Sequence, residues 1–265
     1  DDPEEVVVRR APLWVSWALG GKVDDAVSEI QSMKLTESSR LHLLLQLMYR
    51  AGRHDETLAL LQQLRSHLEG FTKSNVVQIA RIAYKCGDDI AARQLLPRDL
   101  VGLDEEMWLE EGLEIATGLE DDELIKRYDA QLTALFPNSE RLRENRDRRL
   151  LLNCREVSVH RGHAFTTAGF SAQHLEILDA VTMPTPHYDE LIEKATKWGN
   201  EWLELAVICC AMHARTVNKN LDAIEAGSLI TSSPLYGRQA TQIVLSATRA
   251  LMLEGGVPQE EREYY

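Results

Sequence analysis

The sequence predicts an all-α chain that contains repeated helix pairs. Strand signals are nearly absent, since the β-branched runs are confined to Val6–Val8 and Val157–Val159, which are too short to found a sheet. Apolar residues recur instead at spacings of three and four, as they do from Leu41 to Met48, and this is the period of one helix face. Such segments end at four glycines, separated by 31, 35 and 31 residues: Gly21, Gly52, Gly87 and Gly118.

The glycines divide the first half of the chain into comparable segments. Trp17–Met33, Leu44–Leu64 and Ile79–Leu96 each have the pattern of a helix end, a turn at the glycine and a second amphipathic helix. Glycine is expected there because a closing helix often places one residue in a left-handed conformation that other residues resist. Residues expected to cap helix starts are Thr36, Asp104, Asn138, Asn200 and the Ser233–Pro234 pair.

The second half of the chain has a less regular pattern. We expect helical repeats over residues 1–150 and a second helical region over residues 151–265. Residues 141–149 hold five arginines, expected on a solvated helix: Arg141, Arg143, Arg146, Arg148 and Arg149. A turn-rich break at 183–186 precedes helices expected at about 187–198, 200–215, 219–230 and 234–254. Further degenerate repeats and a separate helical cap domain are both open interpretations of this half.

The segments around the glycines resemble the tetratricopeptide-repeat (TPR) family. That family places Ala five residues after the glycine; Ala26 and Ala92 fit this pattern, whereas Thr57 and Glu123 do not. The resemblance covers about residues 5–150. It implies a right-handed α-solenoid of antiparallel helix pairs, a TPR-like superhelix, followed by a more irregular helical C-terminal region.

The resemblance also implies a concave groove lined by polar positions of each first helix. In that family these positions lie 2, 3, 6, 10 and 13 residues before the turn glycine. Counted from Gly52 and from Gly87 they include a Tyr followed by a basic residue both times, and counted from Gly118 they include Trp108. Aromatic and Arg side chains anchor interfaces because they combine large contact area with directional hydrogen bonds. The expected groove residues are Ser39, His42, Gln46, Tyr49, Arg50, Ser74, Arg81, Tyr84, Lys85 and Trp108.

The charge balance excludes some partners. Lys and Arg total 29 against 42 Asp and Glu, which gives a formal net charge of −13. Such a surface repels phosphate, so neither nucleic acid nor an anionic membrane is an expected partner. Apolar runs fall short of the roughly 18 residues of a membrane span, so no membrane insertion is expected. Eleven acids lie between Asp99 and Glu123, and they fit either solvated helix faces or a docking patch for a basic segment.

The cysteines and the start of the chain bear on its location. The four cysteines have no CxxC spacing, and Cys209 and Cys210 lie in an apolar helical pattern, which is typical of buried free thiols. Free thiols favour a reducing compartment, so we expect a cytoplasmic protein. The chain begins at Asp1 without a methionine, and we expect it to be processed or to be part of a longer protein.

The expected function is a non-enzymatic scaffold or adaptor that holds a peptide or partner protein in the groove, without a cofactor. The sequence has no phosphate-binding GxxxxGK[ST] motif and no GxGxxG or GxSxG motif. The alternative is a helical regulatory domain or a metal-dependent enzyme, because Glu156, His160 and His163 have a loose metal-ligand spacing. Self-assembly through apolar faces at the first or last repeats is a third interpretation, and it would make the chain a homo-oligomer.

Overall fold

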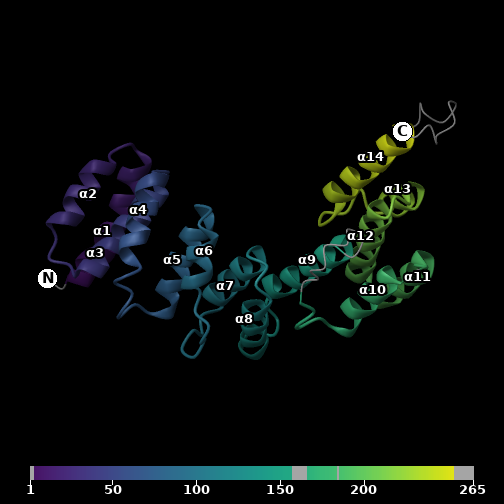
Figure 1. Cartoon of the computed structure of the whole chain (residues 1–265), viewed down its shortest axis with the longest axis horizontal. Helices are drawn as coiled ribbons and strands as arrows, with labels where there is room; N and C mark the ends of the chain where they lie inside the picture. The colour runs from purple at the N-terminus through teal and green to yellow at the C-terminus, as the bar shows by residue number, and fades with distance from the viewer. Residues whose placement is uncertain (1–2, 157–165, 184, 254–265) are drawn as a thin grey trace. The chain divides into compact units, whose positions relative to one another are not determined.

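The computed structural model describes residues 3–156, 166–183 and 185–253. Within these ranges the chain forms fourteen helices and no strand, which confirms the predicted all-α class (Figure 1). The helices fall into two compact units, Asp1–Leu135 (unit 1) and Phe136–Tyr265 (unit 2). No helix in the described ranges combines the length and the apolar character that crossing a membrane requires.

Unit 1 consists of helices that follow one another in chain order (Figure 1). The odd-numbered helices contact each other in sequence, α1 with α3, α3 with α5 and α5 with α7, and each packs on the even-numbered helix that follows it. Their bounds are α1 (Pro3–Leu19), α2 (Val23–Ser32), α3 (Glu37–Arg50), α4 (His54–Leu64), α5 (Lys73–Lys85), α6 (Asp89–Leu95), α7 (Glu106–Gly118) and α8 (Asp122–Leu135).

A left-handed residue follows the first helix of each pair in unit 1. Gly21, Gly52 and Gly87 have φ angles of 78°, 71° and 79°, which confirms three of the four predicted glycine turns. The fourth is wrong, because Gly118 is the last residue of α7 and Glu120 takes the left-handed conformation with φ 54°. A residue with a side chain is strained by about 1–2 kcal/mol in this conformation. Glu120 adopts it despite this cost, and the sequence therefore has no glycine to mark the turn.

The same backbone hydrogen bond closes all of these turns and one more. The N–H after the left-handed residue donates to the carbonyl five residues earlier, and Asn218 (φ 61°) repeats the arrangement in unit 2. The five bonds run from Lys22 to Trp17, Arg53 to Met48, Asp88 to Ala83, Asp121 to Ala116 and Lys219 to Ala214. The residue five positions after the left-handed one is fully buried each time: Ala26, Thr57, Ala92, Ile125 and Ala223.

Side chains join each turn of unit 1 to the next pair. Arg53 Nη1 lies 2.9 Å from Asp24 Oδ1, and Cys86 Sγ lies 3.9 Å from His54 Nδ1. Further along, Arg93 Nη1 of α6 lies 2.8 Å from Asp121 Oδ2 in the fourth turn. The turns of neighbouring pairs therefore lie side by side along one edge of the unit.

The described residues of unit 2 form six helices around a core of their own. These are α9 (Glu140–Glu156), α10 (Ala172–Thr182), α11 (Tyr188–Trp198), α12 (Asn200–Thr216), α13 (Asn220–Ser228) and α14 (Gly237–Leu253). Helix α12 is the centre of this core, and Cys209 and Cys210 are fully buried in it, as predicted. Burial raises the pKa of both thiols, and the cysteines are free. Trp198 and Trp202 are partly buried and pack against the same core at the junction of α11 and α12.

Only part of the predicted capping is found. The Thr36 side chain accepts from Ser39 N–H and caps α3, as expected. The caps predicted at Asp104 and Asn200 are wrong, because the N-cap residues of α7 and α12 are Glu105 and Gly199. At α9 the N–H of Leu142 donates to the hydroxyl of Ser139, in place of the predicted Asn138. Each of these helices is capped one residue away from the predicted position.

The arginine-rich helix α9 is not simply solvated. Arg149 is fully buried, and its guanidinium donates to Asn145 Oδ1 and to the carbonyls of Thr166 and Ala168, each at 3.0 Å. The ring of Phe170 lies 5.3 Å from the guanidinium carbon. A buried cation is tolerated only when such donors are satisfied, so Arg149 fixes the segment before α10 onto α9. The expectation of a solvated helix is wrong at this position.

Helix α10, which the sequence pattern did not reveal, begins with a capping box. Its N-cap Ser171 accepts from the N–H of His174, while His174 Nδ1 lies 2.8 Å from Ser171 Oγ and accepts from Ser171 N–H. On the other side of the ring, Nε2 lies 2.8 Å from Asp147 Oδ1 of α9. Ser, His and Asp thus lie in a row, but the serine oxygen is engaged as a helix cap. The row anchors α10 on α9.

Candidate functional site

A hollow of about 200 Å³ lies between α3 and α5 of unit 1. Four of the predicted groove residues line it, namely Gln46, Tyr49 and Arg50 from α3 and Arg81 from α5; Gln78 and Ile82 of α5 complete the lining. The prediction gave these residues as polar positions of two separate helices. The structure brings them to one place.

A hydrogen-bonded network fixes the polar side of this hollow. Gln46 Nε2 lies 2.9 Å from both His42 Nε2 and Gln78 Oε1, and His42 Nε2 lies 3.2 Å from the same Gln78 oxygen. The edge of the Phe71 ring covers His42, with ring centroids 5.2 Å apart. His42 is buried, and this burial lowers its pKa. The network joins α3 to α5 through a neutral imidazole.

This lowered pKa predicts that unit 1 loses stability in mild acid. The unfolded His42 titrates near 6.5, so below that pH the unfolded chain binds a proton that the folded chain excludes. We expect the free energy of unfolding to fall between pH 7.5 and pH 5.5 because of this group. Urea unfolding at both pH values measures it, with His42→Gln as the comparison. Equal losses in the wild type and the variant would contradict the assignment.

Two basic residues of α5, Arg81 in the lining of the hollow and Lys85 outside it, pair with acids of α7. Arg81 Nε lies 3.1 Å from Glu111 Oε1, a side chain that is itself buried, and Lys85 Nζ lies 3.7 Å from Glu114 Oε1. Lys85 also lies 5.7 Å from the Tyr84 ring centroid. Arg50, in the last turn of α3, is exposed. Contacts from α5 to α7 therefore hold Arg81 and Lys85 in place, whereas Arg50 projects beside them.

About half of the acidic run between Asp99 and Glu123 is paired inside unit 1. Five of its eleven acids form ion pairs with basic residues of the unit, and Ser74 donates to a sixth, Glu105, at 3.1 Å. The ion pairs are Asp99 with Lys73, Glu111 with Arg81, Glu114 with Lys85, Asp121 with Arg93, and Glu123 with Arg98 and Arg127. About half of the predicted docking patch is thus engaged within unit 1, and three of these ion pairs join α5 or α6 to α7 or to the turn before α8.

The remaining predicted groove residues lie outside the hollow. Ser39 lies at the capped start of α3, and Ser74 is engaged with Glu105. Tyr84 reaches α7, where its hydroxyl occupies the place that a Cβ on Gly118 would take. Trp108 is half-buried on α7. Because the fourth turn is set by Glu120, the count that selects Arg81 in α5 selects Glu114 in α7 and leaves Trp108 out of register.

Gln78 and Glu111 are site residues that the sequence reasoning missed. Gln78 follows Val77, the position ten residues before Gly87, and only its contact with His42 of the neighbouring helix identifies it. Glu111 was counted only as one acid in a run, although its burial requires a cationic partner. Both residues belong to the site because of contacts between neighbouring helix pairs, and the pattern within one helix does not contain that information.

The metal-enzyme alternative rests on His160 and His163, which lie outside the described residues. In the described ranges, no group of three or more His, Cys, Asp or Glu side chains could hold a metal ion. No protein-family model, no curated protein and no solved structure matches this chain.

Proposed function

We propose that the chain is a TPR-like interaction scaffold, in which unit 1 stacks antiparallel helix pairs into a right-handed solenoid that binds a peptide segment of a partner protein. The support is local and repeated. Four turns share one left-handed closure and one backbone bond, and each is followed five residues later by a buried contact position. The first helices contact each other in sequence, as they do when pairs stack side by side.

The hollow between α3 and α5 is the observation that carries the binding role. Its volume of about 200 Å³ suits one side chain of a partner. Arg50 and Arg81 present guanidinium donors, and Tyr49 offers an aromatic wall, so an acidic or amide-bearing side chain is the matching anchor. The network of His42, Gln46 and Gln78 orders the lining in advance, which lowers the entropy cost of binding.

Selection from a random peptide library displayed on phage tests this proposal. The immobilised full chain is expected to enrich peptides that share an Asp or Glu anchor, and the enriched peptides are then titrated by fluorescence anisotropy. Arg50→Ala together with Tyr49→Ala is expected to weaken binding by about tenfold or more, because anchor residues in a hollow dominate such interfaces.

Lys126→Ala is the matched control, since Lys126 is an exposed basic residue on α8. It should leave the dissociation constant unchanged, while circular dichroism confirms that all variants keep their helical content. Enriched peptides that bind the Tyr49/Arg50 variant as tightly as the wild type would refute the assignment of the hollow.

A further inference from the structure

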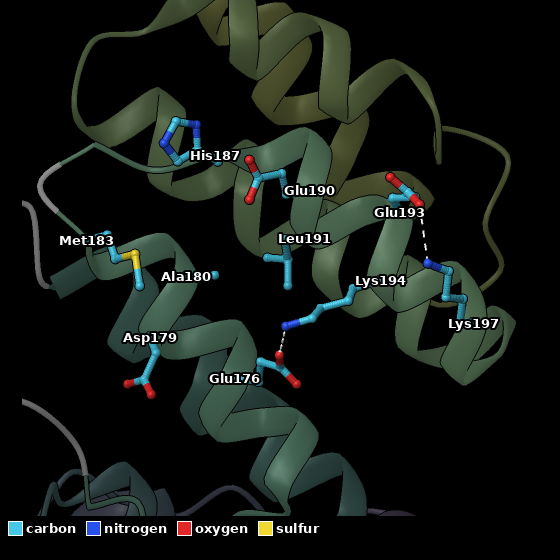
Figure 2. A pocket seen from close by; sticks show the side chains of 10 residues that line it. All are labelled: Glu176, Asp179, Ala180, Met183, His187, Glu190, Leu191, Glu193, Lys194 and Lys197. Atoms are coloured by element: carbon cyan, nitrogen blue, oxygen red, sulfur yellow. Dashed lines mark hydrogen bonds and ion pairs between the residues drawn. The ribbon is translucent and has the colours of Figure 1, made fainter.

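Two hollows flank α11 in unit 2, far in sequence from the surface on α3 and α5. One, of about 440 Å³, lies between α10 and α11, and Figure 2 shows the side chains that line it. The other, of about 470 Å³, lies between α11 and α13. His187 and Glu193 line both hollows, so the two flank one continuous strip of α11. From His187 to Lys197 this strip is about 15 Å long.

The lining of the two hollows is strongly acidic. It holds seven carboxylates, Glu176, Asp179, Asp189, Glu190, Glu193, Asp222 and Glu225, and two lysines, Lys194 and Lys197. Both lysines are already engaged, Lys194 with Glu176 and Lys197 with Glu193, while Lys219 lies 3.9 Å from Asp222 at the edge. Among the described residues, Asp179, Asp189, Glu190 and Glu225 have no such ion pair.

The same surface also exposes large apolar side chains to solvent. Met183 is 54% exposed at the end of the first hollow, and Leu229 is 62% exposed beside the second. Leu191 and Ala180 form apolar parts of the first hollow, and Ile192 contributes to the second. An aliphatic side chain of a partner would therefore contact apolar side chains as well as carboxylates in the two hollows.

We propose that this surface binds a basic amphipathic segment of a partner protein. Asp179 lies on the α10 side of the first hollow and Glu190 on the α11 side, with Met183 and His187 at the same end (Figure 2). A Lys or Arg side chain of the partner enters between the two carboxylates and lays its aliphatic stem against Met183. We call the two hollows together the α11 groove. Its other end carries Lys194 and Lys197, held by Glu176 and Glu193, and this difference in charge between the two ends fixes the direction of the segment. This role is independent of the hollow in unit 1.

The probe is a fluorescein-labelled helical peptide of about 18 residues, with leucine on one face and lysine on the other. Anisotropy titrations of the full chain are run with this peptide and with a counterpart that has glutamate in place of lysine. We expect the lysine peptide alone to bind, and its affinity to fall when salt is raised from about 50 mM to about 300 mM. Binding of both peptides with equal affinity, or no binding of the lysine peptide at low salt, would overturn the proposal.

Matched variants separate this groove from the general negative charge of the chain. Asp179→Asn with Glu190→Gln removes two charges from the groove, whereas Asp25→Asn with Glu69→Gln removes two exposed charges from unit 1. We expect the groove pair to weaken binding about five- to tenfold and the control pair less than twofold. Equal losses for the two pairs would show non-specific attraction and sink the proposal.

Two further readouts locate the peptide. Met183→Ser is expected to weaken binding about threefold, and Leu245→Ser, an exposed leucine on α14, is expected to leave it unchanged. In NMR spectra the peptide should shift amide signals in residues 176–197 and 222–229. Shifts confined to residues 99–123 of unit 1 would instead assign the basic segment to the acidic run there and contradict the groove on α11.

Discussion

Arg149→Ala is expected to lower the free energy of unfolding of unit 2 by about 3–5 kcal/mol, the cost typical of removing one member of a buried, charged network. The substitution removes a fully buried side chain together with the hydrogen bonds that it donates to Asn145 Oδ1 and to the carbonyls of Thr166 and Ala168. It also empties the space against the Phe170 ring. Urea unfolding followed by circular dichroism measures the loss.

Arg148→Ala is the control for this prediction, because Arg148 is the exposed neighbour on the same helix. It should change stability by no more than about 0.5 kcal/mol. Hydrogen exchange followed by mass spectrometry is expected to show faster exchange in α9 and α10 for Arg149→Ala. If both alanine variants unfold at the same urea concentration as the wild type, Arg149 has no structural role.

Gly112→Ala is expected to destabilise unit 1 by about 2 kcal/mol, although alanine favours helices over glycine by about 1 kcal/mol. A Cβ on Gly112 of α7 would lie 2.0 Å from Tyr128 Cε1, and Tyr128 of α8 is fully buried. The ring cannot turn away without leaving the core between the two helices. The unfolding transition measured in urea should therefore move to lower denaturant concentration.

Gly118→Ala tests the reason for this effect in the same helix. Its Cβ would meet the Tyr84 hydroxyl at 2.0 Å, but Tyr84 is only half-buried and its hydroxyl end can move. We expect a change of less than about 1 kcal/mol. Gly112→Ala should also cost much less in a Tyr128→Leu background, since the ring that it meets is gone. A loss that is the same in both backgrounds would contradict the packing explanation.

The sequence predicts the local parts of this fold well. Helical periodicity identified the all-α class and the helices near residues 188–198 and 200–216, because each signal lies within the element itself. Glycine marked three turns because it adopts the left-handed conformation of these turns at the lowest steric cost. The fourth turn was predicted at Gly118 because a glycine was expected there. Glu120 adopts the left-handed conformation instead, and Gly118 allows close packing against Tyr84.

The sequence alone could not predict which residues far apart in the chain contact each other. Arginine normally indicates a solvated surface, and the partners that bury Arg149 include carbonyls 17 and 19 residues further along the chain. Helix α10 was missed because its cap uses His174 in place of the usual Glu or Gln three residues after the serine. In the candidate site, Tyr49, Arg50 and Arg81 were predicted, whereas Gln78 and Glu111 depend on which helix lies beside which.

Site-specific photo-cross-linking tests the central claim, that a partner segment lies on α3 and α5. The full chain is prepared with benzoylphenylalanine in place of Tyr49, or in place of Lys126 on α8, and is irradiated with the peptide that library selection enriches most. Our account predicts a cross-link from position 49 that excess unlabelled peptide abolishes, and none from position 126. Efficient cross-linking at 126 with none at 49 would place the segment on a different face and contradict the account.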